Sequence, residues 1–238
     1  MTASNVEFRT DTGALEIGRI PRVVGTLSSF DFAGDFCCDV VEVRLDRTNT
    51  QSDWLWRCKK IQSGGKPVLL TARLRAEGGN WLSDDSKREA VYAEALRELA
   101  AVDVELSSVF CGSVCAEAAR LRKACVVSFH NFQETPPLAD LCTIAEKGMT
   151  VGSIAKISTM INREEDVAVL KSLLGHLWPK PICVIGMGEA WAQTRVEFAA
   201  LGSCLTYGYL DGSAAPGQWH AAELLRQVRA ALPASAKT

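Results

Sequence analysis

The chain has 238 residues, of which 47% are hydrophobic and 23% charged, so it can bury a full core without a metal ion or a disulfide. Its 26 Lys and Arg residues against 28 Asp and Glu give a formal net charge of −2, and without a basic stripe to follow a phosphate backbone we expect no nucleic-acid partner. No apolar run approaches the roughly 18 residues of a membrane span and the first ten residues do not resemble a signal peptide, so we expect a cytoplasmic protein with no membrane partner.

The first element that the sequence predicts is a hairpin over residues 6–19. Two runs of alternating polar and apolar residues flank Asp11, Thr12 and Gly13, a composition typical of two strands and a tight turn. Eight short runs rich in apolar and β-branched residues follow, and we predict that each is a strand. They span residues 22–28, 38–46, 67–74, 102–107, 125–130, 154–160, 181–187 and 203–210.

Amphipathic stretches separate these runs, with apolar side chains repeating on one helix face. The clearest examples are residues 91–99, 167–177 and 224–232. Another helix is marked by its ends: Thr135, before Pro136 and Pro137, predicts an N-cap followed by proline in the first turn, and Gly148 predicts the end.

Eight strands alternating with helices indicate a (β/α)₈ TIM barrel, because a doubly wound sheet rarely needs eight near-equal units. No glycine- or proline-rich linker divides the chain, so we expect one barrel domain over residues 1–238. The predicted N-terminal β-hairpin would then close the bottom of the barrel, at the N-terminal ends of the strands.

Ionisable and hydroxyl side chains recur two residues apart near the ends of five successive predicted strands. A barrel interior is normally filled by Val, Ile and Leu, and barrel enzymes keep their active sites at the C-terminal face. These side chains therefore predict either an active site or a structural network of ion pairs, although alternation alone does not say which face points inward. The set comprises Glu42, Arg44, Thr71, Arg73, Asp103, Glu105, Ser128, His130, Lys156 and Ser158, with Glu77 on the loop after the third strand.

Lys156 carries the most specific chemical signal. It lies between Ile154, Ala155 and Ile157, and an amine held among apolar side chains favours the neutral form that attacks a carbonyl. His130, one strand earlier, would reach the carbon beside such an imine. The pair therefore indicates Schiff-base chemistry with a proton carrier, whereas the alternative is a lysine that extends from the strand end into solvent.

Seven strings, in this order and spacing, resemble type I 3-dehydroquinate dehydratase (3-dehydroquinase). They are Glu42-Val43-Arg44, Thr71-Ala72-Arg73 with Glu77-Gly78-Gly79, Asp103-Val104-Glu105, Ser128-Phe129-His130, Lys156-Ile157, Gly186-Met187-Gly188 leading to Arg195, and Ala215-Pro216-Gly217-Gln218. The resemblance covers nearly the whole chain. It implies a (β/α)₈ barrel, usually a homodimer, that converts 3-dehydroquinate to 3-dehydroshikimate in the shikimate pathway of aromatic amino acid biosynthesis.

The resemblance also implies the catalytic roles. Lys156 would form the Schiff base, His130 would act as the general acid and base, and Glu77 would orient that histidine. The implied substrate-binding residues are Glu42, Arg44, Arg73, Arg195, Gln218 and Ser213. Arg195 would hold the substrate carboxylate.

The implied chemistry calls for no cofactor. The nine cysteines and three histidines show no zinc-ligand spacing, so we also expect no metal site and reduced thiols.

Two positions depart from the family pattern. Ala214 stands where the family has a serine, with Ser213 one residue earlier, and Trp191 replaces a glycine.

Two other functions are compatible with the same residues. A class I aldolase also places an imine lysine on a barrel strand, but the loop at residues 215–218 offers little of the glycine-rich phosphate site that such enzymes usually need. A degenerate, non-catalytic barrel is the other, although Lys156, His130 and Glu77 are all retained.

Overall fold

Eight parallel strands form a barrel in the computed structural model, which describes residues 5–18, 20–48, 52–82, 84–176, 178 and 180–233. Their spatial order is β10-β3-β4-β5-β6-β7-β8-β9. Each overlaps one of the eight predicted runs, which confirms the predicted (β/α)₈ fold. Their bounds are β3 Arg22–Leu27, β4 Val40–Arg44, β5 Val68–Thr71, β6 Ala101–Glu105, β7 Ala124–Asn131, β8 Ile154–Met160, β9 Ile182–Met187 and β10 Leu205–Tyr209.

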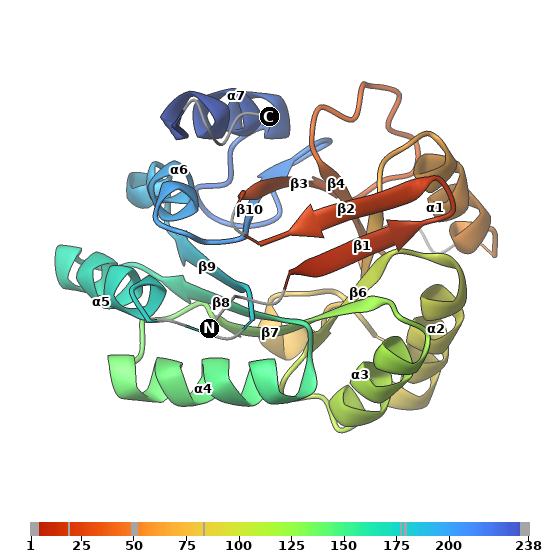
Figure 1. Cartoon of the computed structure of the whole chain (residues 1–238), viewed down its shortest axis with the longest axis horizontal. Helices are drawn as coiled ribbons and strands as arrows, with labels where there is room; N and C mark the ends of the chain where they lie inside the picture. Colours follow the sequence, from red (N-terminus) through yellow and green to blue (C-terminus); the bar gives the residue numbers. More distant parts are fainter. Residues whose placement is uncertain are drawn as a thin grey trace.

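Helices surround the strands (Figure 1). They are α1 Trp54–Ser63, α2 Asp85–Glu98, α3 Cys111–Arg120, α4 Leu138–Val151, α5 Glu164–Leu174, α6 Thr194–Ala200 and α7 Ala221–Ala231, with short 3₁₀ turns η1 Arg75–Glu77 and η2 Glu189–Trp191. The connection from β3 to β4, residues 28–39, forms no helix. Instead Phe30, Phe32 and Phe36 pack there against the core.

Strands β9 and β10 meet at the seam of the barrel, where Ser203 bridges them. Its hydroxyl accepts the Val184 N–H at 2.9 Å and lies 2.9 Å from the Leu205 carbonyl oxygen, while the Cys204 N–H donates to Ile182 at 2.9 Å. The barrel is therefore nearly closed even though these strands share no regular ladder.

The barrel interior has an apolar lower half and a polar upper half. Val24, Val40, Leu69, Val126 and Ile154 belong to one buried apolar cluster inside the N-terminal half. Two residues further along these strands, on the same face by the strand period, come the polar side chains Thr26, Glu42, Thr71, Ser128 and Lys156. The polar side chains singled out in the sequence therefore point into the barrel. Alternation along the strands had not shown which face points inward.

The N-terminal hairpin covers the lower end of the barrel. Strands β1 (Val6–Thr10) and β2 (Gly13–Ile17) pair antiparallel, with Thr10 opposite Gly13. Phe8 and Ile17 have no exposed surface and pack in the same cluster as the lower interior residues. The hairpin lies in front of the barrel strands in Figure 1, so the predicted closure of the barrel bottom is confirmed.

The predicted ends of α4 are wrong. The helix begins at Leu138 with Pro137 as its N-cap residue and ends at Val151. The Thr135 hydroxyl does not cap it, because it donates to the Met160 carbonyl oxygen at 2.8 Å and so ties the preceding loop to β8. Gly148 lies inside the helix, where a Cβ would sit 3.2 Å from that of Ala155, so the glycine serves close helix-to-strand packing.

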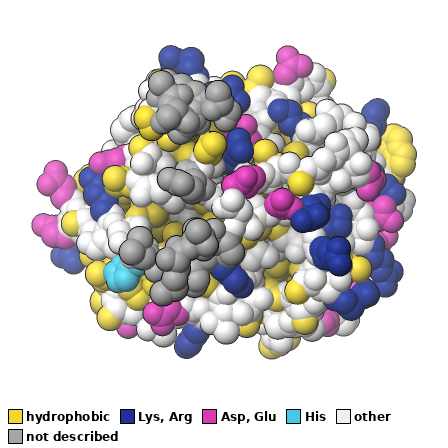
Figure 2. All heavy atoms as spheres, in the orientation of Figure 1, with side chains coloured by type: hydrophobic (Ala, Val, Ile, Leu, Met, Phe, Trp, Pro, Cys, Tyr) yellow, Lys and Arg dark blue, Asp and Glu magenta, His cyan; other side chains and the backbone are white. Residues whose placement is uncertain are grey.

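The surface mixes both signs of charge, as the near-neutral composition requires, and Figure 2 shows Lys and Arg side chains scattered among Asp and Glu on one face. None of the described helices is long and apolar enough to cross a membrane.

Candidate active site

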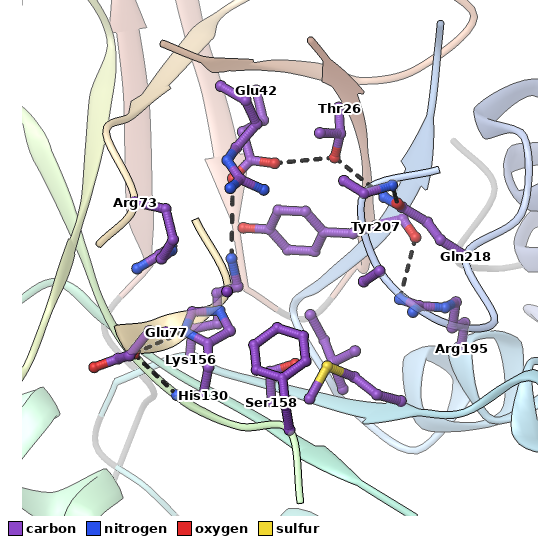
Figure 3. A pocket seen from close by; sticks show the side chains of 17 residues that line it. Thr26, Glu42, Arg73, Glu77, His130, Lys156, Ser158, Arg195, Tyr207 and Gln218 are labelled. Atoms are coloured by element: carbon purple, nitrogen blue, oxygen red, sulfur yellow. Dashed lines mark hydrogen bonds and ion pairs between the residues drawn. The ribbon is translucent and has the colours of Figure 1, made fainter. Parts of the chain in front are cut away.

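A cavity opens at the C-terminal ends of the strands, above the polar layer. Eight of the nine predicted site residues line it: Glu42, Arg44, Arg73, Glu77, His130, Lys156, Arg195 and Gln218 (Figure 3). They come from β4, β7 and β8 and from the segments that follow β5, β9 and β10. Parallel strands all end at the same rim of a barrel, which is why residues more than 170 positions apart meet here.

Lys156 extends from the middle of β8 into this cavity and is 4% exposed. Its Nζ donates to Asp103 Oδ2 at 2.9 Å, lies 4.0 Å from Glu42 Oε1, and sits 4.1 Å from the centre of the Tyr207 ring. The expected apolar surroundings are therefore wrong for the amine itself. Ile157 and Ala155 pack on the opposite, helix-facing side of the strand, and the amine meets carboxylates.

Asp103 joins Lys156 to a buried polar network. Its Oδ1 accepts from Arg73 Nη2 at 2.5 Å and from the Ser128 hydroxyl at 2.7 Å. Burial raises the pKa of Asp103, but the nearby Arg73 and Lys156 cations outweigh it and hold that pKa well below the usual range. Asp103 therefore stays ionised and fixes the position of Nζ.

Arg73 is held from two sides. Besides Asp103 it meets Glu105 at 3.2 Å, and Glu105 in turn pairs with the fully buried Arg88 at 2.8 Å. Alternating charges thus run from α2 to Lys156, which compensates each buried ion with an opposite one.

His130 lies at the end of β7 with 9% of its side chain exposed. Its Nδ1 is 2.9 Å from Glu77 Oε2, and the same oxygen accepts the His130 backbone N–H at 3.1 Å. Burial, together with Arg73 and Lys156, lowers the pKa of His130 well below 6.5. The imidazole is therefore neutral at neutral pH and available as a base.

Glu77 is positioned by the glycines that follow it. Gly78 has φ of +77°, and a Cβ there would meet the Phe132 ring at 2.4 Å, while one on Gly79 would meet the Arg73 carbonyl oxygen at 2.1 Å. Glycine is needed at both positions. The resulting turn brings Glu77 back over β7, where Ser107 donates to its Oε1 at 2.7 Å and burial raises its pKa.

Glu42 and Arg44 stand side by side on the inner face of β4. The Glu42 carboxylate accepts from Thr26 at 2.9 Å and from Thr71 at 2.8 Å. Arg44 forms a bidentate pair with Asp46 at 2.8 and 2.9 Å, which fixes the plane of its guanidinium.

Arg195, in the first turn of α6, is 3% exposed. Its nitrogens donate only to main-chain oxygens, those of Gly217 at 2.9 Å and of Pro216 and Tyr207 at 3.3 Å. No carboxylate among the described residues pairs with it, and burial lowers its pKa to about 10. A buried cation that faces a cavity without a counter-ion is suited to an anionic group of a ligand.

The loop after β10 covers part of the cavity. Gln218 links it to the barrel, because its Oε1 accepts the Ala214 N–H at 2.8 Å and its Nε2 donates to Thr26 at 3.2 Å. Ala214 and Ala215 line the cavity, but Ser213 does not. Ser213 is exposed and its hydroxyl donates to the Ala215 carbonyl oxygen at 2.9 Å, so the structure does not bring this predicted binding residue to the site.

Trp191 lies at the end of η2, and its carbonyl oxygen accepts from the Thr194 hydroxyl at 2.7 Å, next to the first turn of α6. A turn requires glycine where φ is positive. In this turn the residue with a positive φ is Gly188, at +124°, and not Trp191, so the turn does not need the glycine that Trp191 replaces.

Several lining residues were not predicted as site residues: Thr26, Phe132, Met187 and Tyr207. Ser158, which also lines the cavity, was among the polar strand residues but had no assigned role. Asp103, which contacts Lys156, was noted among the polar residues of the predicted strands, but no role was assigned to it. Alternation along β6 pointed to Asp103, whereas nothing local marks Thr26 or Tyr207 as different from other strand residues.

Among the residues that the structure describes, no three His, Cys, Asp or Glu side chains are grouped as they would be around a metal ion. All nine cysteines are free thiols. What the cavity does hold is an amine, a neutral imidazole oriented by a carboxylate, and an uncompensated guanidinium. This set can form an imine with the ketone of a carboxylic acid and move a proton beside it.

Comparison with known proteins agrees with this chemistry. The family model for type I 3-dehydroquinase matches residues 20–232. A 3-dehydroquinate dehydratase from Pyrobaculum aerophilum is 40% identical over 153 residues, 63% of this chain and half of the length of that protein. Another from Methanococcus maripaludis is 32% identical over 185 residues, covering 76% of this chain and 82% of that protein.

Among solved structures, a type I 3-dehydroquinate dehydratase from Clostridium difficile with covalently modified comenic acid superposes with a TM-score of 0.83. It covers 95% of this chain and 98% of the other at 21% identity, which shows a shared fold. The resemblance drawn from the sequence motifs is confirmed. The chain belongs to the type I 3-dehydroquinase family, whose relatives here are 3-dehydroquinate dehydratases, hydro-lyases of the shikimate pathway.

Proposed function

We propose that this protein converts 3-dehydroquinate to 3-dehydroshikimate and water through a Schiff base on Lys156. The observation that carries the proposal is the buried amine of Lys156 in one cavity with the His130 and Glu77 pair. A lysine used only for structure would need no neutral imidazole beside it.

Substrate binding follows from the charges of the cavity. Arg195 would hold the carboxylate, because it is the buried cation that faces the cavity without a counter-ion among the described residues. Glu42, Arg44, Arg73 and Gln218 would contact the hydroxyl groups. Arg73 and Arg44 already have carboxylate partners, so their orientation is fixed before the substrate arrives, which reduces the entropic cost of binding.

Imine formation would begin when the Lys156 ammonium loses a proton to His130 and the amine adds to the ketone. The carbon–oxygen double bond opens to a carbinolamine, and the oxygen then leaves as water as the carbon–nitrogen double bond forms. The protonated imine is an electron sink for the adjacent carbon.

Elimination would use His130 a second time. The imidazole removes the proton from the carbon next to the imine, the electron pair moves toward the nitrogen, and it returns to expel the hydroxyl group on the next carbon, which takes up the proton as water. Hydrolysis of the imine then frees the product and Lys156. Glu77, 2.9 Å from Nδ1, would stabilise the imidazolium that forms between the two transfers.

Borohydride reduction tests this proposal directly. Mixed with 3-dehydroquinate and borohydride, the protein should gain a stable adduct, and peptide mapping should place it on Lys156. Lys180 is an internal control, because its Nζ binds the carbonyl oxygens of Met149 and Gly152 away from the cavity. No adduct, or an adduct on a lysine other than Lys156, would contradict the mechanism.

We further propose, following the family resemblance, that residues 1–238 act as one barrel domain and that the protein works in the cytoplasm as a homodimer. Light scattering at micromolar concentration tests the assembly, because a homodimer gives twice the chain mass of 25.8 kDa.

A further inference from the structure

Tyr207 is the one residue of the cavity whose polar atom is buried and has no hydrogen-bond partner among the described residues. It belongs to β10, is 4% exposed, and its Oη forms no hydrogen bond with the part of the chain that the structure describes. The other buried phenol, Tyr92, forms hydrogen bonds: its hydroxyl donates to the Asp103 carbonyl oxygen at 2.8 Å and accepts the Ala72 N–H at 3.2 Å. Buried hydroxyl groups are normally paired in this way.

The nearby acceptors already accept hydrogen bonds from other groups of the chain. The Glu42 carboxylate accepts from Thr26 and Thr71, the Gln218 carbonyl accepts from Ala214, and the oxygens of Asp103 accept from Arg73, Ser128 and Lys156. The side chains of Ile185 and Met187 on the neighbouring strand offer no strong acceptor. A molecule bound in the cavity can therefore supply the acceptor that the Tyr207 hydroxyl does not find among the described residues.

The position of the Tyr207 ring indicates which oxygen of the bound molecule the hydroxyl can reach. The Lys156 amine lies 4.1 Å from the centre of the Tyr207 ring. In Figure 3 the hydroxyl end of that ring points toward Lys156 and Glu42. A carbon that becomes bonded to Nζ can therefore lie beside the ring, with an oxygen on that carbon near the hydroxyl at its edge. Burial raises the pKa of Tyr207 well above 10, so the group keeps its proton and acts as a donor.

We propose that the Tyr207 hydroxyl donates a hydrogen bond to the substrate oxygen that Lys156 displaces, first as the ketone and then as the carbinolamine. This rests on the proposed Schiff-base function. When the amine adds, the carbonyl π bond opens and its electron pair moves to the oxygen, which Tyr207 stabilises. One nitrogen proton passes to that oxygen, the imidazolium of His130 supplies the second, and the oxygen departs as water. Tyr207 keeps its own proton throughout.

Tyr207→Phe is the direct test, because it keeps the ring beside Lys156 and removes only the hydroxyl. We expect the rate of borohydride-trapped adduct formation to fall roughly 10- to 100-fold, between the loss of one neutral hydrogen bond and that of a full oxyanion-hole donor. Tyr209→Phe is the matched control. It lies two residues further on in the same region of β10, contacts His220 and does not line the cavity, so its trapping rate should equal that of the unmodified protein.

Two further readings separate this role from a structural one. If imine formation becomes slower in Tyr207→Phe, the kinetic isotope effect on kcat with substrate deuterated at the carbon beside the ketone should shrink. The thermal midpoint should not fall, because an unpaired hydroxyl stabilises nothing. An unchanged trapping rate would overturn the inference, as would a lowered midpoint, which would mean that the hydroxyl has a partner in the folded chain.

Failure of the proposed function gives a different result. In that case the unmodified protein itself would form no adduct with 3-dehydroquinate. If only the inference fails, the unmodified protein still forms the adduct, and Tyr207→Phe forms it at the same rate.

Discussion

The Glu77 carboxylate holds His130 at two points through a single oxygen. Oε2 lies 2.9 Å from the ring Nδ1 and accepts the backbone N–H of the same residue at 3.1 Å. The contact to the backbone N–H holds Glu77 close to β7, and the contact to Nδ1 fixes the orientation of the imidazole ring. Nε2 is therefore left for the substrate, as a base beside an imine requires.

Removing the imidazole should slow turnover strongly without abolishing binding. We expect His130→Ala to lower kcat by roughly 100- to 10,000-fold, the usual contribution of a general acid and base. Borohydride should still trap some adduct on Lys156, more slowly. His176→Ala is the matched control, because His176 is exposed and stacks on Trp178 at the end of α5. Near-normal turnover of His130→Ala would make His130 a structural residue.

Glu77→Gln should act through His130. The amide keeps the shape of the side chain but removes the charge that favours the imidazolium, so we expect steady-state kinetics to show kcat lowered by roughly tenfold, less than in His130→Ala.

In the unmodified protein the low pKa of His130 predicts an acid limb of the kcat/KM profile below pH 6.5, because the neutral base is lost only when the pH falls through that pKa. An acid limb above pH 6.5 would contradict this assignment.

Arg195→Met should raise KM for 3-dehydroquinate by roughly 10- to 100-fold, the equivalent of losing a hydrogen-bonded charge. The methyl ester of the substrate supplies the control, since it has no carboxylate charge. The unmodified enzyme should strongly prefer the acid to the ester, and the variant should not. If the variant retains the preference, the carboxylate binds elsewhere.

Ala214→Ser should lower KM two- to tenfold with little change in kcat, because Ala214 lines the cavity and the serine adds one neutral hydrogen bond to the substrate. Ser213→Ala is the control, and steady-state kinetics should find it unchanged, since the Ser213 hydroxyl binds the Ala215 carbonyl oxygen within its own loop. Weaker binding in Ser213→Ala would show that the loop shifts by one residue when the substrate binds.

Phe8→Ala should destabilise the barrel and spare its chemistry. Phe8 has no exposed surface and fills the lower end of the barrel, opposite the active site. Its truncation should lower the free energy of unfolding by about 3–5 kcal/mol, measured by urea denaturation, with kcat of the folded protein unchanged. Arg9→Ala, at an exposed position of the same strand, should stay within about 0.5 kcal/mol.

The eight strands, the hairpin and eight of the residues that line the cavity could be predicted from local patterns and motifs. Apolar and polar periodicity is local, so it survives without tertiary information, and the eight predicted runs overlap the eight strands. The motifs around Lys156, His130 and Glu77 were specific as an ordered set, because each gives a residue type that the chemistry needs at a strand end. Arg195 and Gln218 followed from the same order and reach the same cavity.

The face of each strand that points inward, and the residues that meet across strands, could not be predicted from local patterns. Asp103 and Lys156 are 53 positions apart, and Tyr207 is 51 further on; their contacts depend on the register of parallel strands, which no local pattern encodes. The same holds for Ser213, whose side chain turns away with its loop, and for Thr135, whose hydroxyl found a partner on β8 instead of the helix it precedes. A hydrogen bond goes to whichever acceptor the assembled fold brings within reach, and for these residues that acceptor was set by packing rather than by neighbours in the chain.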